Sequence, residues 1–130
     1  MATWQEIGRD SFQAAHELLE QGRFRSSVSR AYFGLYSLVT AQLGDRGLTL
    51  SQAERDNPGH QQVLTMLEHN LISRDTRPAL KRQITRASRT VQRARVVADY
   101  GPGLTVDQSL ARAVLRDAHF VARQIGSEDV

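Results

Sequence analysis

The stretch PALKRQITRASRTVQRARVVADYGPG, residues 78–103, carries the most regular apolar pattern in the chain and decides its fold class. Apolar residues recur at alternating steps of four and three, which places them along one side of an α-helix. Pro78 suits a first helical turn, and the Gly-Pro-Gly at 101–103 is expected to end the helix. The apolar seam comprises Leu80, Ile84, Ala87, Val91, Ala94 and Ala98.

Two more helices are predicted at the start of the chain. Thr3 and Glu6 have the spacing of a capping box, which indicates a helix over roughly residues 4–20. Apolar residues spaced by three and four indicate a second helix over 24–42, and Gly44 is expected to end it.

The rest of the chain adds a short helix and a long one. Asn57 followed by Pro58 is typical of a helix start, and this short helix is expected to continue through Val63, Leu67 and Leu71. Thr105 and Gln108 form a second capping box before a last helix. Its seam comprises Leu110, Val114, Ala118, Val121 and Ile125. The sequence therefore predicts an all-α protein, an antiparallel up-and-down bundle of four main helices plus a short inserted helix.

Size and composition limit the organisation of the chain. With 130 residues, of which 40% are hydrophobic, we expect a single domain over 1–130. The absence of cysteine excludes a disulfide framework and suits the cytoplasm, where we expect the protein to lie. No signal peptide and no apolar run of membrane-spanning length is present, so we expect no membrane partner.

Positive charge is concentrated in one part of the chain. The net charge is +3, but the segment from Arg74 to Arg95 holds eight basic residues and one acid, which leaves −4 for the remainder. Such a basic region favours an anionic partner, RNA or a nucleotide.

Two polar stripes follow the seams of the third and last long helices. Each member lies about two positions past a seam residue, so the stripes are expected to face solvent. A solvated arginine face without a ligand is one interpretation, and contact with phosphate groups is the other. The stripes are Arg82, Arg86, Arg89 and Arg93, and then Arg112, Arg116, His119 and Arg123.

Arg95 differs from these arginines because it lies on the shoulder of the seam, where a half-buried guanidinium needs a partner. Asp99 is one helical turn away and could pair with Arg95, or with Arg30 on the second helix. The cluster is then a polar clasp that closes the bundle. Alternatively, Arg95 and Tyr100 face a binding cleft.

Two stretches of the sequence resemble the HEPN superfamily, and in particular small stand-alone prokaryotic HEPN proteins. They are Ser29-Arg30-Ala31-Tyr32-Phe33 on the second helix and Arg95 to Tyr100 at the end of a later one. The resemblance implies a helical bundle that commonly forms a homodimer. It also implies a toxin-antitoxin or defence module in which a minimal nucleotidyltransferase is the partner.

Active members of that family cleave RNA without metal, through an arginine followed after four to six residues by a histidine. Arg95 matches the arginine, but Tyr100 stands at the histidine position and Pro102 where a modifiable tyrosine can follow. Histidine, with a reference pKa of about 6.5, suits general acid–base chemistry near neutrality better than tyrosine, at about 10. The missing histidine favours a non-catalytic role, although His119 could substitute for it.

We therefore expect an RNA- or nucleotide-binding protein in which Arg95, Tyr100 and the basic stripes contact the ligand and Ser29, Arg30, Tyr32 and Asp99 shape the site. The alternative is a metal-independent ribonuclease whose active motif differs from that of the family, with Tyr100 in place of the histidine. A helical adaptor is a third interpretation, but no second copy of a repeat unit is present. Nothing suggests a cofactor, and the spacing of the four histidines does not suggest a metal site.

Overall fold

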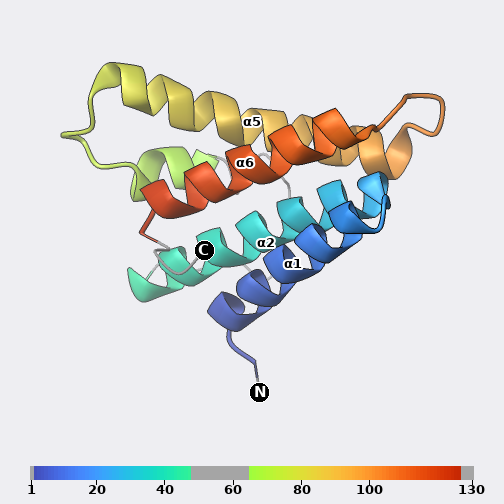
Figure 1. Cartoon of the computed structure of the whole chain (residues 1–130). Coiled ribbons are helices and arrows are strands. Elements are labelled where there is room, and N and C mark those ends of the chain that lie inside the picture. The colour runs from blue at the N-terminus through green and yellow to red at the C-terminus, as the bar shows by residue number, and fades with distance from the viewer. Residues whose placement is uncertain (1, 48–64, 127–130) are drawn as a thin grey trace.

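A computed structural model describes residues 2–47 and 65–126, which form helices and connecting turns with no strand among them (Figure 1). The elements are α1 (Trp4–Glu20), α2 (Phe24–Asp45), η1 (Leu67–Leu71), α5 (Pro78–Tyr100) and α6 (Gln108–Gln124). The prediction of an all-α helical bundle is confirmed. In this described part of the chain, no helix is both long and apolar enough to cross a membrane.

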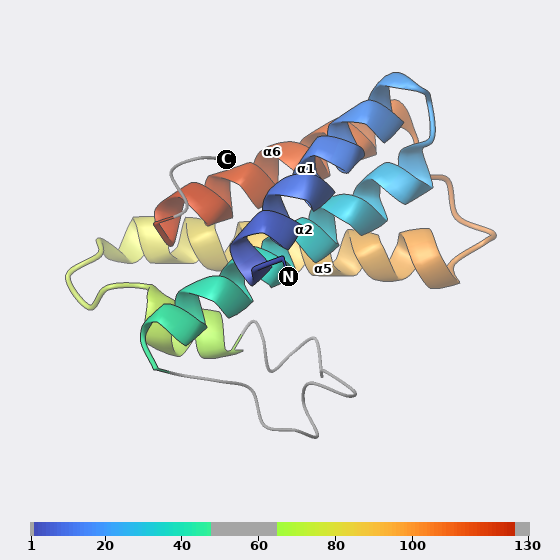
Figure 2. The ribbon, with the colours of Figure 1, turned by 90° about the horizontal axis from the view of Figure 1, so that it is seen from below.

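The long helices pack around a shared apolar core. α2 contacts α1, α5 and α6, while α1 packs chiefly on α2 and α5 packs on α2 and α6. Figures 1 and 2 show α1 beside α2, with α5 and α6 covering the other side of α2. Predicted seam residues of α5 and α6 are buried, including Ile84, Val91, Val114 and Val121. The bundle therefore presents separate lateral surfaces where α2 meets α5, where α5 meets α6 and where α1 meets α6.

Two predicted helix starts are as expected. The Thr3 side chain accepts a hydrogen bond from the Glu6 backbone N–H, and the Glu6 carboxylate accepts one from the Thr3 N–H, both at 3.1 Å. Pro78 occupies the first turn of α5, where its missing N–H costs no helical hydrogen bond.

Two predicted boundaries were wrong. α2 continues through Gly44, and the left-handed turn that follows it falls on Gly47, with φ 75°. The proposed capping box from Thr105 to Gln108 does not form, because α6 begins later and Asp107 is its N-cap. The Asp107 carboxylate accepts a hydrogen bond from the Leu110 N–H at 2.9 Å. As for the short inserted helix, residues 57–64 lie outside the described residues, and the described part at Leu67–Leu71 is π-helical.

α1 and α2 approach each other closely at two glycines. A Cβ placed on Gly8 would lie 2.7 Å from the Leu38 side chain, and one on Gly34 would lie 3.0 Å from the Phe12 ring. Leu38 is fully buried and Phe12 is 3% exposed, so neither neighbour has space to move away. The absence of side chains at these positions therefore determines the crossing of α1 and α2, and with it the orientation of the remaining faces of α2.

Candidate functional site

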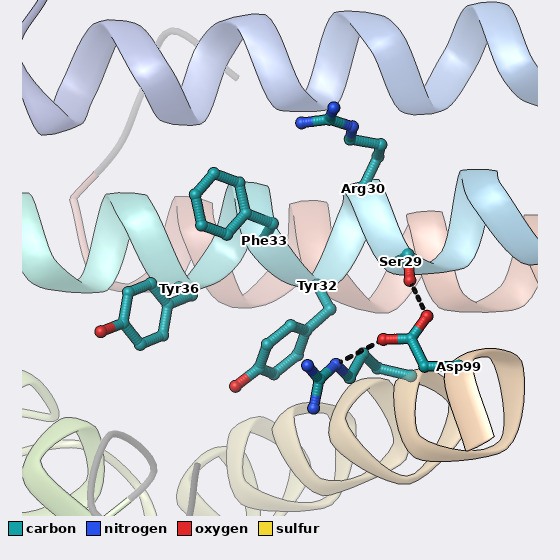
Figure 3. A pocket seen from close by; sticks show the side chains of 7 residues that line it. Ser29, Arg30, Tyr32, Phe33, Tyr36 and Asp99 are labelled. Atoms are coloured by element: carbon teal, nitrogen blue, oxygen red, sulfur yellow. Dashed lines mark hydrogen bonds and ion pairs between the residues drawn. The ribbon is translucent and has the colours of Figure 1, made fainter. Parts of the chain in front are cut away.

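A groove of about 360 Å³ lies where α2 meets the end of α5 (Figure 3). On α2, Ser29, Tyr32 and Tyr36 follow a spacing of three and four, so they share the side of the helix that faces α5. Both stretches that carry the HEPN resemblance contribute side chains. The lining residues are Ser29, Arg30, Tyr32, Phe33, Tyr36, Arg95 and Asp99.

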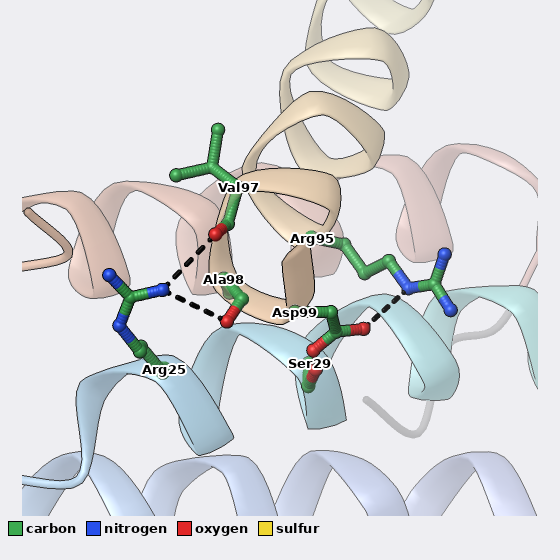
Figure 4. Close-up of polar contacts among 6 residues, drawn as sticks. All are labelled: Arg25, Ser29, Arg95, Val97, Ala98 and Asp99. Atoms are coloured by element: carbon green, nitrogen blue, oxygen red, sulfur yellow. Dashed lines mark hydrogen bonds and ion pairs between the residues drawn. The ribbon is translucent and has the colours of Figure 1, made fainter. Parts of the chain in front are cut away.

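Asp99 makes two contacts at once, one within α5 and one from α5 to α2 (Figure 4). Its carboxylate lies 2.8 Å from Nε of Arg95, one turn back on α5, as the i,i+4 spacing predicts. The same carboxylate accepts a hydrogen bond from the Ser29 hydroxyl on α2. The side chains of Arg95 and Asp99 are only 18% and 29% exposed, so water weakens their attraction less than it would on an open surface. This arrangement has the geometry of the polar clasp.

Aromatic rings flank the Arg95 guanidinium. Its central carbon lies 5.2 Å from the centroid of the Tyr32 ring and 5.4 Å from that of Tyr100, within the range of cation–π attraction. Burial raises the pKa of Tyr32 to about 12, against a smaller lowering by the Arg95 charge. Tyr32 therefore stays protonated at physiological pH. Tyr100, by contrast, is 69% exposed at the end of α5 and is accessible to a ligand.

Arg30 does not pair with Asp99, although it was one of the two partners considered for that carboxylate. In the described residues, no ion pair joins it to Asp99, because Ser29, the preceding residue on α2, occupies that side of the helix. One residue corresponds to about 100° of rotation around a helix. Figure 3 shows the Arg30 side chain extending away from Asp99, on the same side of α2 as Phe33. Arg30 therefore presents its charge at the opposite border of the groove.

Arg25 is a structural determinant that the sequence analysis missed. One of its Nη atoms donates to the carbonyls of Val97 and Ala98, each at 3.1 Å (Figure 4). The other donates to the carbonyl of Gly101 at 3.1 Å and to that of Leu104. The last carbonyls of a helix have no partner within it, and they attract cations through the helix dipole. Arg25 thus holds the end of α5 and its turn against the start of α2.

The two predicted stripes come together at one point, a groove between α5 and α6. Their arginines are exposed, as predicted, and Arg86 and Arg116 line a shared groove of about 340 Å³ with Phe120. Arg89 forms an ion pair with Glu68 at 3.4 Å. The exposed arginines of the stripes are Arg82, Arg86, Arg89, Arg93, Arg112, Arg116 and Arg123.

His119 does not share the solvent-exposed face of these arginines, so its predicted placement was wrong. Its ring stacks on Phe12 with centroids 4.5 Å apart, and its Nε2 lies 2.8 Å from Nε2 of His16 on α1. Its Nδ1 is buried and has no hydrogen-bond partner within the described residues. Burial lowers the pKa of His119 to about 4, with smaller contributions from His16 and Arg123. The ring is therefore neutral at pH 7, and it packs against α1.

Two further findings bear on the identity of the site. In residues 2–47 and 65–126, no cluster of three or more acidic or histidine side chains could hold a metal ion. No protein-family model matches the chain, and no curated protein matches it in sequence.

The clasp predicts different stabilities for two variants in the same groove. Asp99→Ala removes the carboxylate that both Ser29 and Arg95 contact, so unfolding should become easier by about 1–2 kcal/mol and the melting temperature should fall by several degrees. Arg30→Ala should melt like the wild type, and calorimetry of both variants checks this. Equal melting temperatures for Asp99→Ala and the wild type would exclude a clasp.

The histidine pair predicts a loss of stability in mild acid. Below about pH 6.5 the unfolded chain takes up a proton at residue 119 that the folded chain, with a pKa of about 4 there, does not bind. The contribution of His119 to the free energy of unfolding is therefore complete above pH 6.5. It falls by about 1–2 kcal/mol as the pH decreases to 5. Urea unfolding across this range should show the decline in the wild type and in the exposed-site control His69→Gln. The decline should be smaller in His119→Leu, and an unchanged decline there would contradict the assignment.

Proposed function

We propose that this chain is a HEPN-type protein that binds RNA or a nucleotide, as one component of a toxin-antitoxin or defence module with a nucleotidyltransferase partner. The proposal rests on the resemblance of two stretches of sequence to that superfamily. The observation that carries it is the contact between them, since Ser29 of one stretch donates to Asp99 of the other and Tyr32 lies 5.2 Å from the Arg95 guanidinium. Residues that specify a family site should converge in space, and these do.

The charge distribution supports an anionic ligand. Arg86 and Arg116 border a groove between α5 and α6, and other exposed arginines continue along both helices. The groove between α2 and α5 contains two arginines and one carboxylate, Asp99, which already contacts Arg95 and Ser29. Arginine suits phosphate because its planar guanidinium can donate two parallel hydrogen bonds.

The proposed partnerships, with a second copy of the chain and with a nucleotidyltransferase, require an accessible surface. Large apolar side chains are exposed near the end of α5, where Val96, Tyr100 and Leu104 are 44%, 69% and 58% exposed. Val96 and Tyr100 lie one helical turn apart on α5, so their side chains are neighbours, and adjoining exposed apolar side chains are typical of protein-contact surfaces. This end of the bundle is therefore our candidate for the homodimer contact.

A metal-independent ribonuclease of the same fold is the second candidate function. Tyr100 occupies the position of the motif histidine, and its ring lies 5.4 Å from the Arg95 guanidinium carbon. The described residues that line the groove include no histidine, and His119 packs against Phe12 of α1 instead. Tyr100 is not among the residues that line this groove, which offers arginines, the phenols of Tyr32 and Tyr36 and the Asp99 carboxylate, but no imidazole base. This composition favours binding over cleavage.

The binding function predicts that charge reversal in the α5/α6 groove weakens RNA binding. The double variant Arg86→Glu with Arg116→Glu should lose about tenfold or more in affinity for transfer RNA, and the dependence of log Kd on log salt should become less steep by about one per lost contact. Arg23→Glu, on the turn between α1 and α2, reverses one charge outside both grooves and is the matched control for each single variant, Arg86→Glu and Arg116→Glu. Filter binding at several salt concentrations measures both quantities. Unchanged affinity would leave these arginines as a solvated surface.

Incubation of the protein with transfer RNA in excess EDTA separates the two candidate functions. We expect intact RNA from both the wild type and Arg95→Ala, because the groove lacks an imidazole and its one carboxylate, Asp99, is already held by Arg95 and Ser29. Cleavage that persists in EDTA and disappears in Arg95→Ala would instead identify a metal-independent ribonuclease.

A further inference from the structure

Phe33 is an exposed aromatic ring inside the groove, outside the Arg95–Asp99 cluster. It is 38% exposed, whereas its neighbours Tyr32 and Tyr36 are each 8% exposed. Exposure of a large apolar ring within a concave surface leaves one of its faces available for a ligand. Phe33 makes no contribution to the clasp, so its exposure is not explained by that interaction.

Phe33 stacks in parallel with one neighbouring ring, that of Tyr36. The Phe33 and Tyr36 rings are nearly parallel, with planes 9° apart and centroids 6.2 Å apart. Trp4, from the start of α1, packs edge-on against Tyr36 with centroids also 6.2 Å apart. A planar ligand lying on Phe33 would extend the Phe33–Tyr36 stack by offset stacking, which is a favourable arrangement of aromatic rings. The geometry therefore suits a flat heteroaromatic group.

Arg30 supplies a positive charge beside this ring. It lies one helical turn before Phe33 on α2, so the two side chains are neighbours on the helix surface. Figure 3 shows both extending to the same side of α2. No hydrogen bond or ion pair engages Arg30 within the described part of the chain, in contrast to Asp99, which Ser29 and Arg95 occupy. An aromatic face and a guanidinium at this spacing match a base and its phosphate.

We propose that Phe33 and Arg30 form a nucleotide subsite, in which one unpaired base stacks on the Phe33 ring and its phosphate contacts Arg30. The subsite rests on the proposed function and assigns two residues to it that lie outside the Arg95 cluster. The groove volume of about 360 Å³ lies in the range of small-ligand sites. A base within a duplex is stacked on its neighbours and cannot reach Phe33, so the subsite selects unpaired nucleotides.

The test is fluorescence anisotropy with a labelled oligoadenylate of about twelve nucleotides, a length within the usual range of single-strand sites. Phe33→Ala should weaken binding between about fivefold and a hundredfold, the loss typical of one stacked base, while Phe33→Tyr should bind like the wild type. Binding of duplex RNA should be unaffected by Phe33→Ala. Arg30→Gln should weaken single-strand binding and reduce its salt dependence by about one phosphate contact, with Arg23→Gln as the matched control.

Competition with AMP distinguishes the two sources of the ligand. Binding of AMP as tight as that of the oligonucleotide, with the same loss in Phe33→Ala, assigns the subsite to a free nucleotide. Tighter binding of the oligonucleotide assigns it to a strand. In either case the single tryptophan, Trp4, should report the event by a change in emission, since it contacts Tyr36 in the groove.

Other outcomes overturn the subsite. If Phe33→Ala binds the oligonucleotide like the wild type while Arg86→Glu with Arg116→Glu loses binding, the subsite is wrong and the proposed function stands. If the wild type binds neither the oligonucleotide, duplex RNA nor AMP, the proposed function fails with it. Should Phe33→Ala not fold, full single-strand affinity in Arg30→Gln contradicts the subsite independently.

Discussion

The position of the candidate site depends on how α5 ends. A helix that stops leaves carbonyls without partners, and here Arg25 donates to four carbonyls of this end and the turn that follows, of which those of Val97 and Gly101 also accept a backbone N–H. The guanidinium comes from the first turn of α2, so the interaction also sets the distance between the two helices. Asp99 and Arg95 lie within the same last turns of α5. Their contacts with Ser29 and Tyr32 on α2 follow from that anchorage.

The bundle separates different kinds of chemistry onto different sides. The α2/α5 side combines aromatic rings with guanidinium groups, the α5/α6 side carries exposed arginines, and the α1/α6 side holds the His16–His119 contact. Desolvation keeps the His119 ring uncharged at pH 7, so this ring adds no positive charge to the α1/α6 side. Binding of an anion to arginine depends strongly on salt and little on pH. The contribution of His119 to the free energy of unfolding depends instead on pH and little on salt.

Much of this arrangement was predictable where it depends on a single helix, and less so where helices meet. The Arg95–Asp99 pair follows from i,i+4 spacing, and the buried seams follow from periodicity. Whether Ser29 or Arg30 reaches Asp99 depends on the rotation of α2 against α5, which periodicity does not specify. The spacing within α6 predicts an exposed His119, because it does not show that α1 packs on that ring. The sequence around Arg25 likewise does not distinguish it from the other arginines as the one that contacts α5.

The glycine contacts between α1 and α2 restrict how the groove can respond to a ligand. When one packed helix slides along another, its side chains must repack between a different set of side chains on its neighbour. Gly8 and Gly34 allow the two backbones to approach so closely that sliding α2 along α1 would drive a neighbouring Cβ into Leu38 or Phe12. Phe33 directly precedes Gly34, so its backbone is held by that contact. Any widening of the groove must therefore come from displacement of α5.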